Sequence, residues 1–187
     1  MNFDFSDDQK MLKDQAHKFL SEQCTTKTVR KVFESKAPYD VQLWKAIGEM
    51  GWTGTAIPEA YGGLGLGYLE LCVIAEELGR ALAPVPFSST VYLFAEALLA
   101  AGSEEQKKRL LPNIAAGKLI GTFARVEGPG AALPKSIRTT FKGGKLSGTK
   151  IAVVDAIGAD YAVVLARASD EPGHARRSAL QRRLEVP

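Results

Sequence analysis

Few residues of this 187-residue chain have a type and spacing that could support chemistry. Two adjacent carboxylates, Glu76 and Glu77, fall within a helical pattern. Adjacent side chains on a helix point about 100° apart, so these two cannot face each other as an acid–base pair. We therefore interpret them as members of ion pairs or capping loops rather than as catalytic groups.

The histidines and cysteines form no catalytic or metal-binding pattern. His17 lies near the polar side of the first expected helix, and His174 lies near the C-terminus. Neither combines with Ser, Cys or Asp in an arrangement typical of nucleophilic catalysis. Cys24 and Cys72 match no metal or redox spacing, so we predict no metal site. Two plain thiols are typical of the reducing cytoplasm, which is the location we expect.

A glycine-rich loop, Ile57–Gly67, is a further candidate because the N–H groups of such loops can bind phosphate. The loop lacks the Gly-Lys-Ser/Thr ending of a P-loop, and no strand of a βαβ unit precedes it. We therefore interpret it as a tight connection before the next helix. Its glycines are Gly62, Gly63, Gly65 and Gly67.

Composition and charge limit the class of protein. The 45% hydrophobic content is typical of a globular core, and no apolar run approaches the ~20 residues that span a bilayer. Met1–Asp8 is acidic and does not resemble a secretory signal. The net charge of +3 comes from the tail His174–Pro187, whose four arginines oppose one acid, leaving 20 basic and 20 acidic residues elsewhere. A neutral body argues against nucleic-acid binding.

The elements that position these residues are helical in the first two thirds of the chain. Capping-box patterns at Ser6 and Ser103 predict helix starts, and Asp40 is a further predicted cap. Apolar residues recur at helical spacing after each of them. Three expected helices begin after the caps Ser6, Asp40 and Ser103, and Pro112 interrupts or ends the last of these. Three others are expected at Thr28–Ser35, Tyr68–Arg80 and Ser88–Ala101.

From Gly117 onward the pattern becomes strand-like. The expected strands are Leu119–Arg125, Ile137–Phe141, Lys145–Thr149, Ile151–Val154 and Tyr161–Arg167, with a hairpin turn at Gly143-Gly144. This order predicts an α+β fold: an N-terminal all-α helical bundle (1–116), then an incomplete antiparallel β-barrel (117–173). We expect the Arg-rich tail, 174–187, to be disordered.

Over roughly residues 1–173 the chain resembles the acyl-CoA dehydrogenase family. The motifs that carry the resemblance are Phe5–Gln9, Gly51–Gly67, Glu76–Arg80, Ala101–Lys107 and Gly148–Lys150. Ala83–Phe87 resembles members of the small-subunit type, which pair with a related partner. The resemblance implies a helical domain, a β-domain and a C-terminal four-helix domain, with FAD between the last two. It also implies α,β-desaturation of an acyl-CoA thioester in fatty-acid β-oxidation, with electron-transferring flavoprotein as acceptor.

The resemblance also implies site residues. Phe123 and Glu127 match the family's flavin strand, whereas Val126 and Ala132 stand where the family has Thr and Ser. Ala152 and Val154 replace a Trp and a Thr. The backbone groups of Arg125 and Val126 can still reach the flavin pyrimidine edge. The implied cofactor-binding residues are Phe123, Arg125, Val126, Ala132, Ala152 and Val154. Ser89 and Leu93 either line the acyl-chain pocket or are core residues.

The resemblance places the catalytic base in the four-helix domain, so we assign no catalytic residue to this chain. We expect a truncated chain, produced by a reading-frame change after about Gly173 or as a natural fragment. It is then a flavoprotein subunit or fragment that is inactive alone. The alternatives are a non-catalytic partner that stabilises a homologous active subunit in a homo- or hetero-oligomer, and a broken product without activity.

Overall fold

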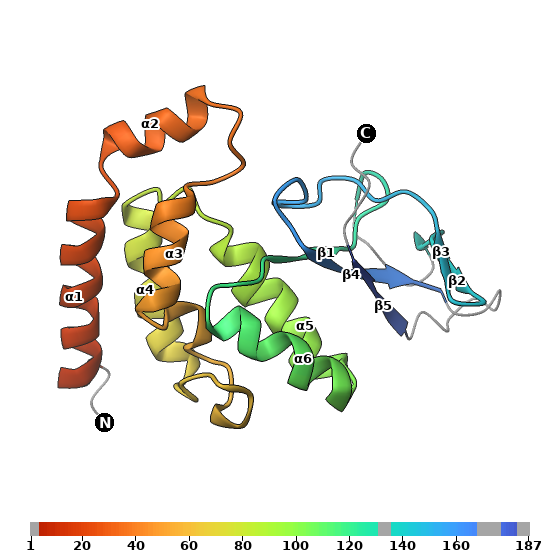
Figure 1. The fold of residues 1–187 in the computed structure, drawn as a ribbon, viewed down its shortest axis with the longest axis horizontal. Helices are drawn as coiled ribbons and strands as arrows, with labels where there is room; N and C mark the ends of the chain where they lie inside the picture. Colours follow the sequence, from red (N-terminus) through yellow and green to blue (C-terminus); the bar gives the residue numbers. More distant parts are fainter. Residues whose placement is uncertain (1–3, 131–135, 168–176, 183–187) are drawn as a thin grey trace. The chain divides into compact units, whose positions relative to one another are not determined.

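The computed structural model describes residues 4–130, 136–167 and 177–182, the last range by its backbone. The chain forms two compact units that interleave along the sequence (Figure 1). The first unit combines Met1–Pro86 with Lys108–Lys118, and the second combines Phe87–Lys107 with Leu119–Pro187. The linear division at residue 116 stays a prediction.

The first unit is helical, and the helices predicted to follow Ser6, Asp40 and Ser103 begin directly after those residues. It contains α1 (Asp7–Gln23), α2 (Thr26–Glu34), α3 (Val41–Glu49), η1 (Trp52–Gly54), η2 (Glu59–Tyr61), α4 (Tyr68–Arg80) and most of α6 (Glu104–Ala115). Ser6 and Gln9 form the complete capping box of α1, and the Asp40 carboxylate accepts from the Leu43 N–H at 2.9 Å. Both caps satisfy N–H groups that have no partner within the helix.

The core of the first unit lies between α1, α3, α4 and α6. α1 packs against α4, and the buried side chains recur on one face of each helix, as the sequence pattern predicts. They include Leu20, Trp44, Ile47, Ile74, Leu78, Leu111 and Ile114. α2 differs from its neighbours because none of its residues is buried.

The prediction that Pro112 interrupts or ends its helix is wrong, because α6 continues to Ala115. Proline removes one backbone hydrogen bond and crowds the preceding turn. Here the buried Leu111 and Ile114 flank Pro112 and hold the last turn in the core. The turn then closes through Gly117 at φ 67°, whose N–H donates to the Ile114 carbonyl at 2.9 Å.

The second unit combines a helix with strands. The predicted helix Ser88–Ala101 is present as two continuous segments, the π-helical η3 (Ser88–Ala95) and α5 (Glu96–Ala101). A three-stranded sheet has the order β1 (Gly121–Ala124), β4 (Tyr161–Ala166), β5 (Arg177–Arg182). β2 (Thr140–Lys142) and β3 (Lys145–Ser147) form a hairpin around Gly143-Gly144, as predicted. Its Leu146 packs against the core residues Ala124, Ala162 and Val164.

The α+β fold class is confirmed, with a helical part followed by strands, and the described strands form no closed barrel. The expectation of purely antiparallel pairing is wrong. β1 pairs with β4 in parallel, with Gly121 opposite Tyr161, while β4 and β5 are antiparallel. A parallel neighbour needs a long crossover, and the 36 residues from the end of β1 to the start of β4 include the β2–β3 hairpin.

Two further predictions are wrong. Ile151–Val154 forms bends and turns instead of a strand, because Ala152 has φ 51° and cannot extend. In the tail that we expected to be disordered, Arg177–Arg182 forms β5, which supplies backbone partners to the edge of β4.

Candidate functional site

Five of the six implied cofactor residues, all except Ala132, come from two segments that the fold brings together within the second unit. The Ile151 N–H donates to the Val126 carbonyl at 2.8 Å, and the Thr122 hydroxyl donates to the Val154 carbonyl at 2.6 Å. Residues 122–126 and 151–154 therefore lie side by side, although 24 residues separate Val126 from Ile151. We call 150–155 the platform segment.

A buried ion pair fixes the start of the platform segment. Lys150 Nζ lies 2.7 Å from Glu127 Oε1, and the two side chains are 7% and 11% exposed. The backbone N–H groups of Arg138 and Thr139 also donate to the Glu127 carboxylate, at 2.5 and 3.0 Å. Burial raises the pKa of Glu127, but the hydrogen bonds from Lys150 and these N–H groups outweigh burial and lower that pKa to about 2. Glu127, which matches the family strand, thus links three segments.

A cavity of about 420 Å³ borders residues 125–130 and 136–138. Arg125 and Val126 are among its lining residues, whereas Phe123, Ala152 and Val154 are not. The carbonyl oxygen of Arg125 accepts from Lys150 Nζ at 3.2 Å, and that of Val126 accepts from Ile151. Ala132, the remaining implied cofactor residue, lies outside the described residues.

The platform segment is strained and carries exposed apolar side chains. Ala152 and Asp155 have φ values of 51° and 54°, in the left-handed region that disfavours residues with a Cβ. Ile151 and Val154 are 43% and 50% exposed. Strain of this kind is typical of segments that hold a ligand, and the exposed alkyl groups offer an apolar contact surface.

The two implied acyl-pocket residues differ in exposure. Ser89 on η3 is fully buried, and its hydroxyl lies 2.6 Å from Asp155 Oδ2. Leu93, one turn later, is 39% exposed. The Ser89 contact joins η3 to the platform segment. Sequence reasoning missed Asp155, although it is the only charged residue between Ile151 and Ile157, a signal that could have marked it.

The N–H groups of the glycine-rich loop donate to nearby backbone carbonyl groups. Those of Gly62, Gly63 and Gly65 donate within the loop at 2.9–3.3 Å, and those of Leu64 and Leu66 donate at 2.9 Å to Gly54 and Thr55, just before it. A Cβ at Gly63 would overlap the Ile57 carbonyl oxygen, so only glycine fits there. The loop is a tight connection, as predicted, since these N–H groups already have acceptors.

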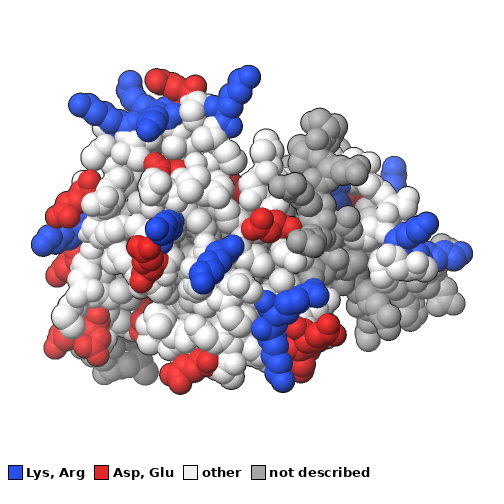
Figure 2. Space-filling model, in the orientation of Figure 1, with Lys and Arg blue, Asp and Glu red and all other residues white. Residues whose placement is uncertain are grey.

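Glu76 and Glu77 form ion pairs, as predicted. Glu76 contacts Lys13 at 2.9 Å and Arg80 at 3.0 Å. Glu77 is only 2% exposed, and its Oε2 lies 2.8 Å from Nδ1 of His17 and 3.3 Å from Nε of Arg80. Acidic and basic side chains intermingle over most of the face that Figure 2 shows, with basic side chains gathered over α2.

Comparisons with known proteins identify the family. A family model described as the N-terminal domain of acyl-CoA dehydrogenase matches residues 6–118. Mitochondrial isovaleryl-CoA dehydrogenase of Solanum tuberosum is 36% identical over 125 residues, which cover 66% of this chain and 30% of the relative. Acyl-CoA dehydrogenase FadE28 of Mycobacterium tuberculosis is 40% identical over 123 residues, which cover 66% and 36%.

Solved structures share the fold over nearly the whole chain. A variant of the Tcur3481–Tcur3483 steroid acyl-CoA dehydrogenase has a TM-score of 0.81 at 34% identity, covering 94% of this chain and 48% of that one. The ChsE4–ChsE5 complex from Mycobacterium tuberculosis has a TM-score of 0.83 at 27% identity, covering 97% and 49%. Glutaryl-CoA dehydrogenase from Mycobacterium smegmatis, in complex with FADH2, has a TM-score of 0.81 at 26% identity, covering 95% and 46%.

The helical unit and the family match define an acyl-CoA dehydrogenase N-terminal domain followed by a few strands. The chain belongs to the acyl-CoA dehydrogenase family. FAD is the cofactor of that family. The chain spans about a third of the length of the curated relatives that it matches. Among the described residues, no helix is long and apolar enough to cross a membrane.

Proposed function

We propose that this chain is a flavoprotein subunit of the acyl-CoA dehydrogenase type that holds FAD weakly and does not desaturate an acyl-CoA thioester by itself. The observation that carries the proposal is the pairing of residues 122–126 with the platform segment. The pairing supports a binding surface for a flat ring, but alkyl groups occupy the positions where a flavin would need hydroxyl groups.

The residues fit the flavin ring in part. The cavity of about 420 Å³ beside Arg125 and Val126 lies within the usual range of ligand sites, about 300–1,000 Å³. Backbone N–H groups of these two residues would donate hydrogen bonds to the pyrimidine edge of the flavin. The side chains of Val126 and Val154 form no hydrogen bond, and each missing bond weakens FAD binding by about 1 kcal/mol. When bound, FAD supplies the hydride acceptor of the family reaction.

The remaining chemistry needs groups from elsewhere. Removal of the α-proton of an acyl thioester requires a positioned base. None of the residues that we assign to the flavin surface has a side chain that could act as the base for this proton. Leu93 would contact the acyl chain through its exposed side chain, while the Ser89 hydroxyl is engaged by Asp155. We therefore expect the base to come from a further domain or subunit, and electrons to pass to an electron-transferring flavoprotein.

Purification of the chain tests this proposal. We expect little flavin absorbance in the isolated chain, a measurable but weak affinity when FAD is added, and no turnover of acyl-CoA thioesters with an artificial electron acceptor. A chain that purifies with stoichiometric FAD and oxidises an acyl-CoA thioester would overturn it.

A partner role is the second candidate. It is favoured by the likeness to chains of the ChsE4–ChsE5 complex, together with the alkyl groups at Val126 and Val154. In this role the chain stabilises a homologous subunit that holds FAD and the base. Co-expression with a longer homologue should give a complex whose FAD stays with the homologue; independent migration of the two chains would exclude this role.

We further propose the cytoplasm as the location, with which the two free thiols, Cys24 and Cys72, are consistent.

A further inference from the structure

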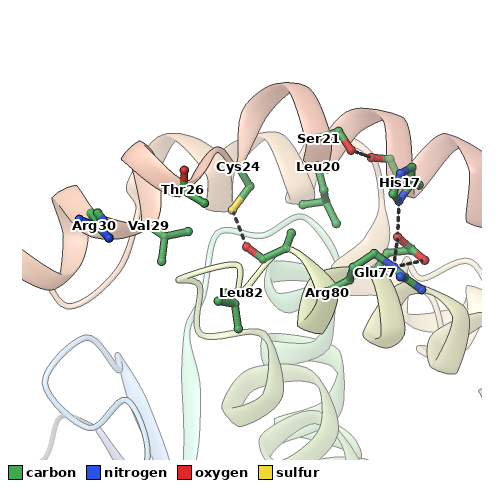
Figure 3. A pocket seen from close by; sticks show the side chains of 11 residues that line it. His17, Leu20, Ser21, Cys24, Thr26, Val29, Arg30, Glu77, Arg80 and Leu82 are labelled. Atoms are coloured by element: carbon green, nitrogen blue, oxygen red, sulfur yellow. Dashed lines mark hydrogen bonds and ion pairs between the residues drawn. The ribbon is translucent and has the colours of Figure 1, made fainter.

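The first unit contains a cavity of about 380 Å³ between α1, α2 and the end of α4 (Figure 3). Its middle is apolar, with Leu20, Val29 and Leu82 among the lining residues. One end is formed by His17, Glu77 and Arg80, and Arg30 lies toward the opposite end of the view. A mostly apolar cavity with a few polar groups is the usual form of a small-molecule site.

The cations at the two ends differ in their partners. Arg80 is neutralised, because Glu76 and Glu77 lie 3.0 and 3.3 Å from its guanidinium. Arg30 is exposed and has no ion pair or hydrogen bond with any residue that the structure describes. It projects from α2, where basic side chains gather (Figure 2). The uncompensated charge therefore attracts an anion to the α2 end of the cavity.

Leu82 gives a second, independent observation. It follows the C-cap of α4 with φ 51°, and Ala83 N–H donates to the Leu78 carbonyl at 3.0 Å, which is the Schellman ending that normally places glycine at this position. The left-handed conformation costs a leucine about 1 kcal/mol. Its side chain is nevertheless 72% exposed while it lines the cavity. Neither backbone geometry nor core packing accounts for a leucine here, whereas contact with an apolar ligand does.

We propose that this cavity binds a medium-chain fatty-acid anion. The carboxylate pairs with Arg30, and the aliphatic chain lies against Val29, Leu20 and Leu82. The His17–Glu77–Arg80 cluster closes the other end with its charges already paired. This site shares no residue with the surface that we assign to FAD.

Titration of the purified 187-residue chain with decanoate, followed by calorimetry, tests the proposal. We expect saturable binding at one site, and weaker binding of decanol, which has the same chain without the charge. Arg30→Gln should weaken decanoate binding about tenfold, as expected for the loss of a charge-assisted contact. Lys31→Gln is the matched control, because it removes a neighbouring cation that does not line the cavity, and should change affinity less than twofold.

Leu82→Gly separates the ligand contact from folding. We expect this variant to unfold at the same or a higher urea concentration, because glycine accepts the left-handed conformation, while decanoate affinity falls about fivefold. Absence of saturable binding by the parent chain, equal weakening by Lys31→Gln, or unchanged affinity of Leu82→Gly would overturn the proposal.

Discussion

The glycine-rich loop and the platform segment are both irregular, and both attract a ligand-binding interpretation, yet they use their polar groups differently. In the loop, the N–H groups of Gly62 through Leu66 all donate to backbone carbonyl groups of the loop or of the residues just before it. The platform segment uses one N–H and one carbonyl group to join residues 122–126, and its Ile151 and Val154 are exposed. Glycine content alone therefore does not mark a binding surface here, because the glycine-rich loop has no free N–H group between Gly62 and Leu66, whereas the platform segment has exposed alkyl groups.

The largest expected effect comes from removing the anchor of the platform segment. Glu127→Gln leaves Lys150, which is 7% exposed, without its counter-charge. An unpaired buried charge destabilises by about 3–5 kcal/mol, which urea unfolding would measure. Glu76→Gln removes a carboxylate whose side chain is 45% exposed, and should cost less than about 1 kcal/mol. Equal effects of the two substitutions would show that Glu127 does not hold the platform segment.

Lowering the pH should break the same ion pair between Glu127 and Lys150. The folded pKa of Glu127 is about 2, below its ordinary value of 4.5. A carboxyl group with a lowered pKa stabilises the fold fully above its unfolded pKa, and the contribution disappears as pH falls through the folded value. We therefore expect about 3 kcal/mol of unfolding free energy to be lost between about pH 5 and 2. In Glu127→Gln this part of the pH dependence should be absent; its persistence would assign the loss to other groups.

Gly63→Ala tests the loop side of the comparison. The added Cβ meets the Ile57 carbonyl oxygen, so backbone must shift, and we expect a loss of about 1–3 kcal/mol in urea unfolding. Gly128→Ala is the control, because no atom lies within 4 Å of its Cβ position, and should stay within about 0.5 kcal/mol. A neutral Gly63→Ala would mean that the loop is not tightly closed.

A smaller effect of opposite sign is expected in the platform segment. Ala152→Gly relieves the left-handed strain at φ 51° and should stabilise by about 0.5–1 kcal/mol. Ala100→Gly in α5 is the contrasting control, since glycine within a helix destabilises by about 1 kcal/mol. Thermal unfolding of both variants measures the difference. A loss of stability in Ala152→Gly would show that the left-handed conformation of Ala152 is not strained.

The helices could be predicted from sequence because their signals are local. Ser6, Asp40 and Ser103 each accept a hydrogen bond from the N–H group three positions later. The β-branched and apolar run Ile151–Val154 suggested a strand, but the left-handed Ala152 has no sequence signal. The parallel β1–β4 pairing depends on residues about 40 positions apart, beyond the reach of local pattern.

The resemblance named residues in two segments that the fold brings together, Val126 in one and Val154 in the other. That these residues bind a flavin stays a prediction. The resemblance gave no indication that Glu127 serves as an anchor or that Ser89 pairs with Asp155, because both interactions depend on which backbone and side-chain groups the tertiary fold brings close.

The weak FAD binding that we propose is tested most directly by restoring the missing hydroxyl groups. FAD titration, followed by flavin fluorescence, compares the parent chain with the double variant Val126→Thr/Val154→Thr, with Val153→Thr as a control next to the site. We predict weak binding by the parent chain and the control, and affinity higher by about tenfold or more in the double variant, at about 1 kcal/mol for each hydrogen bond. Tight binding by the parent chain, or no gain in the double variant, would contradict the account.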